Sequence, residues 1–186
     1  VYHYMAGNNV VRDTAGNATE LMVPGEIFLL RVPAGRMMTR EAWEFFAGSR
    51  NGKPSWTKDI SGKKPVFTDI NGAGTPMGIS YNSPIKRYIL TTQHLKPHAG
   101  MLGIFEAKEP WGPWSTITYL TEDSWFGYDN PEVVPRNCFF WCFPTKWINK
   151  DGRSATMVFT GGGRGKNNDS FNTVRVNLLI NNRNSL

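Results

Sequence analysis

Acidic and aromatic side chains gather in one polar stretch of the sequence, "LTEDSWFGYDNPE" at residues 120–132. Two neighbouring carboxyl groups can serve as general acid and general base, and aromatic faces beside hydrogen-bonding groups are typical of sugar sites. We therefore take Glu122 and Asp123 as candidate catalytic residues, and Trp125 and Tyr128 as candidate substrate-binding residues. The alternative is a solvated acidic loop whose aromatic side chains pack onto the protein.

Four further polar positions lie near the ends of expected strands. Asp69 belongs to a second acidic loop at residues 58–74, "KDISGKKPVFTDINGAG", which is the weaker candidate for acid chemistry. His94 follows an apolar strand, where it would bond a sugar hydroxyl or be an ordinary loop histidine. Arg136 and Lys146 flank the apolar run "FFWCF" and would meet an anionic sugar or a carboxylate of the site, or else be solvated cations.

The sequence predicts no metal site and no cofactor. His94 and His98 are four residues apart, but a proline lies between them and no carboxylate has ligand spacing. The glycine-rich run "GGGRGKNND" at residues 161–169 lacks the phosphate-loop pattern, and a strand rather than a helix is expected after it. We read that run as a turn with a basic tip.

Composition limits the classes of partner. Hydrophobic residues make up 40% of the 186 residues and charged residues 19%, which is typical of a globular chain. The net charge is +6, but the basic residues are dispersed, so no nucleic-acid partner is expected. No stretch approaches the roughly 18 apolar residues of a membrane helix, so no membrane partner is expected either.

Short apolar runs bounded by Gly, Pro, Asn or Asp predict an all-β fold. One run, "TREAWEFFAG", fits either a helical turn or a strand. The strands recur in groups at about 70 to 85 residues, and repeated four-stranded antiparallel sheets indicate a β-propeller. We expect about three four-stranded blades, at approximately residues 1–50, 64–121 and 136–183.

The segment "IFEAKEPWGPWST" at residues 104–116 is predicted to be a corner within one blade. Ile104 and Phe105 would end a strand, the Pro-Trp-Gly-Pro turn would reverse the chain, and Trp114 would open the outer strand. Trp111 and Trp114 would then cover the gap between neighbouring blades. This predicts a structural role for both tryptophans.

An ordered set of motifs resembles the C-terminal half of a bacterial and fungal domain-of-unknown-function family related to endo-D-arabinanases. The motifs span residues 26 to 180 and are "REAWEFFAG", "KPSWTKDI", "YNSPIKRYILTT", "GIFEAKEPWGPW", "KWINKDGRSATMVFTG" and "DSFNTVRV". The resemblance implies a secreted five-bladed propeller that acts on furanoside polysaccharides. The family's N-terminal blades, which carry its Asp-containing motifs, have no counterpart here.

We therefore expect a C-terminal fragment of a longer domain. Five blades need about 250 to 350 residues, and the first residue is Val rather than Met. Three blades cannot close a ring, so missing blades or a second chain would cover the open edges. The expected function is glycoside hydrolysis, with a polysaccharide or oligosaccharide as partner; the rival hypothesis is a glycan-binding propeller module without catalysis.

Overall fold

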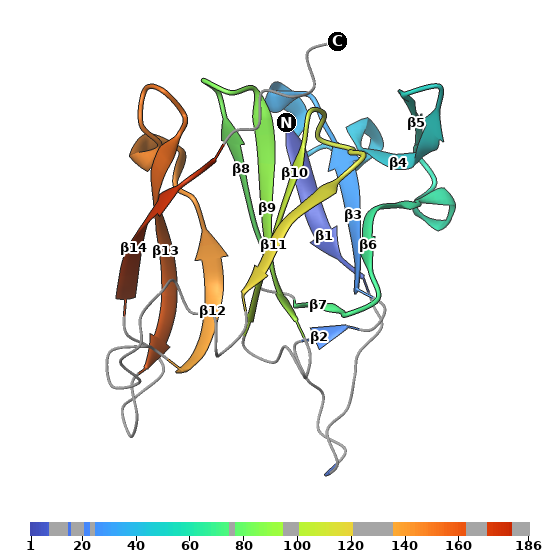
Figure 1. Cartoon of the computed structure of the whole chain (residues 1–186). Helices are drawn as coiled ribbons and strands as arrows, with labels where there is room; N and C mark the ends of the chain where they lie inside the picture. The colour runs from blue at the N-terminus through green and yellow to red at the C-terminus, as the bar shows by residue number, and fades with distance from the viewer. Residues whose placement is uncertain are drawn as a thin grey trace.

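The computed structural model describes residues 1–7, 15, 21–22, 25–74, 77–94, 101–120, 136–162 and 171–179. Three antiparallel sheets follow one another along the chain (Figure 1). The first contains β1 (Tyr2–Ala6), β3 (Gly25–Arg31), β4 (Glu44–Arg50), β5 (Lys53–Thr57) and, paired with β3, β6 (Pro65–Asp69). The second contains β8 (Gly78–Asn82), β9 (Arg87–His94), β10 (Met101–Ala107) and β11 (Ser115–Leu120). The third contains β12 (Arg136–Cys142), β13 (Ser154–Gly162) and β14 (Phe171–Asn177).

Smaller elements join these sheets. Strands β2 (Leu21–Met22) and β7 (Ala73–Gly74) form a two-stranded pair. Single 3-10 turns are η1 (Ala34–Arg36), η2 (Arg40–Ala42), η3 (Ile60–Gly62) and η5 (Thr145–Trp147). The ambiguous run "TREAWEFFAG" therefore contains one 3-10 turn and then strand β4, because Phe45 and Phe46 are buried in the first sheet.

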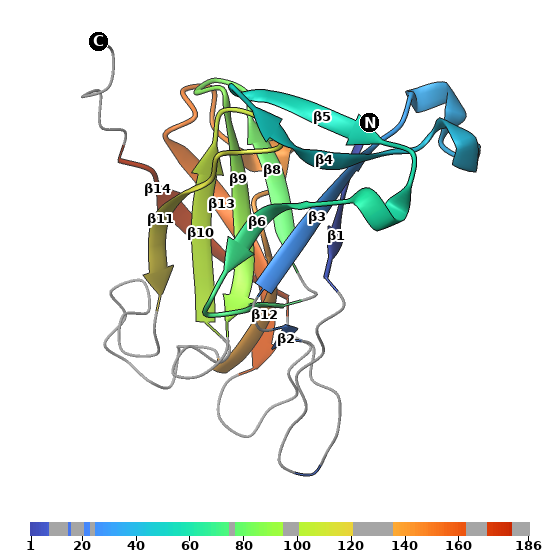
Figure 2. The ribbon, with the colours of Figure 1, turned by 90° about the vertical axis from the view of Figure 1, so that its right-hand side faces the viewer.

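The second sheet is buried on both faces. Strand neighbours point to opposite faces, so Leu90 and Phe105 pack toward the first sheet, in a cluster with Ile27 and Phe67. On the other face Ile89, Leu102 and Ile104 form a cluster with Trp141, Met157 and Phe159 of the third sheet. Strand β6 lies beside β3 in the first sheet (Figure 2), and its Phe67 packs in the cluster that faces the second sheet. One core layer thus lies on each side of the second sheet, and a third cluster of Leu30, Val32 and Phe45 lies in the first sheet.

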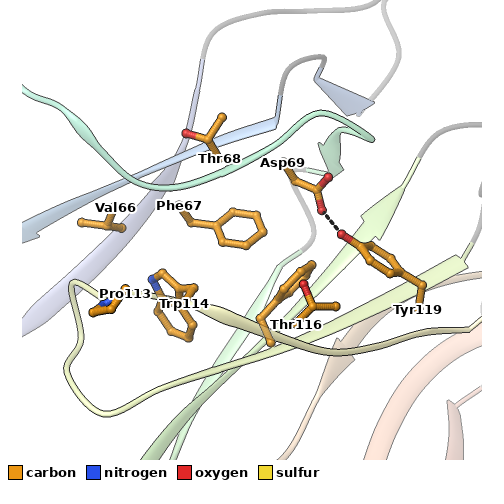
Figure 3. Close-up of a pocket in the computed structure, with 9 residues that line it drawn as sticks. Val66, Phe67, Thr68, Asp69, Pro113, Trp114, Thr116 and Tyr119 are labelled. Atoms are coloured by element: carbon orange, nitrogen blue, oxygen red, sulfur yellow. Dashed lines mark hydrogen bonds between the residues drawn. The ribbon is translucent and has the colours of Figure 1, made fainter.

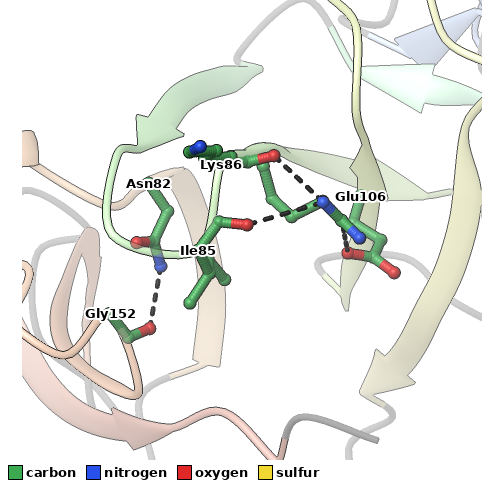
Figure 4. Close-up of polar contacts among 6 residues, drawn as sticks. Asn82, Ile85, Lys86, Glu106 and Gly152 are labelled. Atoms are coloured by element: carbon green, nitrogen blue, oxygen red, sulfur yellow. Dashed lines mark hydrogen bonds and ion pairs between the residues drawn. The ribbon is translucent and has the colours of Figure 1, made fainter. Parts of the chain in front are cut away.

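Close backbone contacts join the second and third sheets. A Cβ on Gly78 would lie 2.2 Å from the carbonyl oxygen of Trp141, so only glycine fits at this position. The hydroxyl of Thr91 donates to the same carbonyl at 2.6 Å. The buried side-chain amide of Asn82 donates to the Gly152 carbonyl at 2.9 Å (Figure 4). These bonds fix the distance between the two sheets.

Contacts within the second sheet also hold the turn between β8 and β9 in place. Arg87 donates through Nη1 to the carbonyl of Lys86 at 3.1 Å, and its Nε pairs with Glu106 of β10 at 3.1 Å, as Figure 4 shows. The turn that contacts Gly152 is therefore attached to the body of the second sheet.

The arrangement confirms the predicted all-β class and is consistent with part of a β-propeller. The described residues contain no α-helix. The second sheet has the expected four strands in sequential order. The first sheet contains β6 as a fifth strand, and three strands of the third sheet are described. The five-bladed ring and the blade limits stay predictions; residues 65–69, placed in the second blade by the sequence, pair with β3 of the first sheet.

The corner predicted at residues 104–116 is confirmed. Strand β10 ends at Ala107, the chain turns through Pro110–Pro113, and β11 begins directly after Trp114. Trp111 lies against Trp56 of the first sheet, with ring centroids 6.3 Å apart, and Trp114 lies against Phe67 at 6.5 Å. Both tryptophans therefore join the first two sheets, which is the structural role that the sequence predicted.

Candidate functional site

Most of the site residues that the sequence predicted lie outside the described residues. Glu122, Asp123, Trp125 and Tyr128 all fall in the segment 121–135, which the structure does not describe. His94 is the last residue of β9 and Arg136 is the first residue of β12. The structure describes the backbone of both residues but not their side chains. Lys146 is exposed in η5.

The structure places Arg136 and Lys146 at opposite ends of β12. Arg136 is the first residue of the seven-residue strand, and Lys146 lies in the turn that follows its last residue. At about 3.3 Å per residue the strand alone spans roughly 20 Å. The two residues therefore lie at opposite ends of an extended strand, and their role in ligand binding stays a prediction.

The described residues form a different pocket, between the first two sheets. We name it the Asp69 pocket (Figure 3). Its volume is about 330 Å³, which is sufficient for one or two sugar rings. It is lined by Val66, Phe67, Thr68, Asp69, Phe105, Pro113, Trp114, Thr116 and Tyr119. The lining therefore combines aromatic rings, three hydroxyls and one carboxylate.

Asp69 is held in place by both of its carboxylate oxygens. It is the last residue of β6 and only 6% exposed. Oδ2 accepts a hydrogen bond from the Tyr119 hydroxyl at 2.7 Å, and Oδ1 accepts one from the backbone N–H of Asn71 at 2.8 Å. The second bond is the local turn expected of an Asp at the start of "DING". The two bonds fix the orientation of the carboxylate at the wall of the pocket.

Tyr119 keeps its proton in this setting. Burial, followed by the hydrogen bond to Asp69, raises the pKa of the phenol above its usual value, while bonds involving Asn71 and Thr116 act in the opposite direction. The phenol is therefore a hydrogen-bond donor at neutral pH and directs its proton at Oδ2 of Asp69. The bond also joins β6 of the first sheet to β11 of the second.

The aromatic wall of the pocket is built from edge-on contacts. The ring centroids of Phe67 and Phe105 are 4.6 Å apart at 65°, and those of Phe105 and Tyr119 are 5.6 Å apart at 85°. Trp114 meets Phe67 at 89°. Edge-to-face packing of this kind is favourable and fixes the rings, so the wall is preformed.

The pocket can bind a polyhydroxylated ring, and its described residues alone do not complete a hydrolytic site. Hydrolysis of a glycosidic bond requires two carboxyl groups about 5 to 10 Å apart. Asp69 is the one carboxylate among the described lining residues. No group of three or more His, Cys, Asp or Glu side chains within the described ranges could hold a metal ion. None of the helices in that part of the chain has the length and apolar composition to span a bilayer.

The sequence favours the loop at 120–132 over Asp69 as the source of acid chemistry, does not single out Tyr119 and predicts only a structural role for Trp114. One signal was available for Tyr119, because it is the second-last residue of the strand "TITYL", which precedes the acidic loop. Its contact with Asp69 could not be read from the sequence, since 50 residues separate the two.

No protein-family model matches the chain, and no curated protein matches its sequence. Among solved structures, exo-β-1,3-galactanase from Phanerochaete chrysosporium with galactose is 16% identical, over 94% of this chain and 39% of that one, with a TM-score of 0.38. A variant of that galactanase with β-1,3-galactotriose is 13% identical, over 93% and 39%, with a TM-score of 0.40. A GH43 β-1,3-galactosidase with galactodeoxynojirimycin is 13% identical, over 94% and 67%, with a TM-score of 0.28. The chain thus spans about 39% of the galactanase. At these TM-scores the likeness is too weak to assign an activity.

Proposed function

We propose that this chain is part of a secreted, glycoside hydrolase-like propeller that acts on a polysaccharide, and that the Asp69 pocket holds one of its sugar rings. The observation that carries the proposal is the buried Asp69 carboxylate in a pocket of aromatic rings and hydroxyls. A sugar ring offers apolar C–H faces to Trp114 and hydroxyls to Asp69 and the two threonines. Ligand sites generally combine an apolar wall with a few convergent polar groups in this way.

The second carboxyl group would come from the segment after β11. Glu122 and Asp123 follow Tyr119 by three and four residues. At no more than about 3.6 Å per residue, the Cα of Glu122 lies within about 11 Å of the Cα of Tyr119. This chain length is compatible with the carboxyl separation that glycoside hydrolysis requires. One of these acids would protonate the leaving oxygen, and Asp69 would act as base or nucleophile.

The substrate class is proposed from the resemblance described above. It favours furanoside polysaccharides of the arabinan type, and β-1,3-galactan is the second substrate to test. Missing blades or a second polypeptide would cover the open faces of the outer sheets. Native mass spectrometry tests this directly, because an assembly heavier than the 20.9 kDa chain supports it and a lone monomer contradicts it.

The activity test pairs one variant with a matched control. Asp69→Asn removes the charge of the buried carboxylate with little change in volume, and Asp59→Asn makes the same change at an exposed position outside the pocket. Turnover of arabinofuranosyl and β-1,3-galactosyl oligosaccharides is expected to fall at least about 100-fold in Asp69→Asn and to change less than about twofold in Asp59→Asn. Full turnover by Asp69→Asn would contradict the proposal.

The second candidate is a glycan-binding module without catalysis. The observation that favours it is the hydrogen bond between Asp69 and Tyr119 of β11, the last strand of the second sheet. This bond already engages one carboxylate oxygen of Asp69. Binding measured by calorimetry separates the two candidates. If Glu122→Gln and Asp123→Asn retain binding but lose turnover, the chain is part of an enzyme; binding with no turnover in any variant supports the binding module.

A further inference from the structure

A second hollow lies on the third sheet, on the side that faces away from the second sheet. It has a volume of about 320 Å³ and is lined by Lys146, Trp147, Ile148, Asn149, Thr156 and Thr173. Thr156 and Thr173 alternate with Met157 and Val174, which pack toward the second sheet, so the two hydroxyls point the opposite way. We name this feature the Trp147 hollow. The second sheet lies between the third sheet, which carries this hollow, and the first sheet (Figure 1).

The aromatic and cationic groups of the hollow are placed side by side. The indole of Trp147 is 37% exposed, and the Lys146 ammonium lies 5.5 Å from the centroid of its ring. Lys146 forms no ion pair with a described carboxylate, since the two pairs found in the described ranges are Arg31 with Glu44 and Arg87 with Glu106. The cation is therefore available to a ligand that covers the indole.

The backbone around the hollow is tied to β13. The N–H of Trp147 donates to the carbonyl of Pro144 at 2.8 Å, and that of Asn149 donates to the carbonyl of Ser154 at 2.9 Å. Ile148 forms a bridge with Ala155 and packs against the core cluster. Because these contacts fix η5 against the sheet, the hollow is present before any ligand binds, and little ordering is needed on binding.

The third sheet and its turns also carry a net positive charge. Their described side chains include four basic ones, Lys146, Lys150, Arg153 and Arg175, against the single acid Asp151. Asp151 already accepts the backbone N–H of Arg153 at 2.9 Å. Arg175 pairs in register with Thr156 and thus lies beside the hollow on the same face. An anionic ligand is favoured at this surface.

We propose that the Trp147 hollow is a binding site for an anionic sugar ring, separate from the Asp69 pocket and independent of any catalysis there. The apolar face of the ring packs on the Trp147 indole, and its carboxylate or sulfate pairs with the Lys146 ammonium. The hydroxyls of Thr156 and Thr173 and the amide of Asn149 bond the ring hydroxyls. Such a site holds an acidic polysaccharide on the outer face of the third sheet.

Calorimetric titration tests this with four probes: trigalacturonate, a sulfated galactotriose, neutral galactotriose and a decamer of thymidylate. Lys146→Gln is expected to weaken binding of the anionic trisaccharide about tenfold, equivalent to about 1.4 kcal/mol, and Trp147→Ala to abolish it. The matched control Lys150→Gln removes the same charge outside the lining and is expected to change the affinity less than about twofold. Asp69→Asn is expected to leave this affinity unchanged, which separates the proposal from the proposed function.

Preference for the carboxylated or the sulfated trisaccharide identifies the anionic group, and either preference supports the proposal. Four results would overturn it: no binding of either anionic probe, equal binding of neutral galactotriose, equal losses in Lys146→Gln and Lys150→Gln, or binding of the thymidylate alone. The last two results indicate diffuse charge and a nucleic-acid surface, respectively. Far-ultraviolet circular dichroism of each variant confirms that its fold is retained.

Discussion

The substitution Tyr119→Phe tests the contact that joins the first two sheets inside the Asp69 pocket. The phenol hydroxyl donates to Oδ2 of Asp69 at 2.7 Å, and Asp69 is 6% exposed. Loss of one partner of a buried charged acceptor costs about 1.5 to 3 kcal/mol. Because Tyr119 is partly exposed, water replaces some of the lost bond, and we expect the lower value, about 1.5 kcal/mol.

Urea unfolding followed by tryptophan fluorescence measures this loss. The free energy of unfolding is expected to fall by about 1.5 kcal/mol with no change in the m value, and the melting temperature by about 3 to 6 °C. The ring of residue 119 is retained in the variant, so its edge contact with Phe105 persists and the loss reports the hydroxyl.

The matched control is Tyr81→Phe. Tyr81 is 39% exposed, and its hydroxyl has no hydrogen-bond partner among the described residues. Its loss is expected to change the free energy of unfolding by less than about 0.5 kcal/mol. If Tyr119→Phe and Tyr81→Phe are equally stable, the bond between Asp69 and Tyr119 does not join the sheets, and the reasoning is refuted.

Three further predictions concern the rest of the fold. Burial raises the pKa of Tyr4 well above its usual value, and the pKa values of Tyr88 and Tyr119 are also raised. The folded state therefore keeps phenol protons that the unfolded chain loses near pH 10. Their contribution to the free energy of unfolding is therefore fully present below about pH 10 and is lost as the pH rises above it. Tyr4→Phe should make this fall shallower by up to about 1.4 kcal/mol per pH unit, and an unchanged slope would contradict this. Gly78→Ala should destabilise by about 3 kcal/mol because its Cβ would meet the Trp141 carbonyl, whereas Gly35→Ala, with nothing within 4 Å, should be nearly neutral; equal unfolding midpoints would contradict the packing argument. Asn82→Ala should cost about 1 to 3 kcal/mol in urea unfolding, because it leaves the Gly152 carbonyl without its partner, and a loss below about 0.5 kcal/mol would show that the bond is dispensable.

The strands could be predicted from the sequence because their signal is local. Alternation and turn residues place "RYILTT" and "TITYL" in strands, and the turn at Trp111–Pro113 follows from its composition alone. The extra strand β6 could not be assigned to the first sheet, since its pairing with β3 joins residues about 40 positions apart. Such pairing depends on which apolar faces meet, and the sequence alone does not show against which sheet Phe67 packs.

The sequence alone says less about how a candidate site is assembled, for a physical reason. A list of polar residues near strand ends does not say at which end of the sheet each residue lies. Arg136 and Lys146 are ten residues apart, and β12 places them at its opposite ends. Asp69 and Tyr119 are 50 residues apart and meet because β6 and β11 face each other across the two sheets. Only the packing of the sheets shows either relation.

The most direct test of the central claim is a crystal structure of the protein soaked with the arabinofuranosyl or β-1,3-galactosyl oligosaccharide that it binds. The account predicts a sugar ring in the Asp69 pocket, against Trp114, with a hydroxyl within hydrogen-bond distance of the Asp69 carboxylate. A bound oligosaccharide located elsewhere, with the Asp69 pocket filled by side chains of the protein, would contradict it.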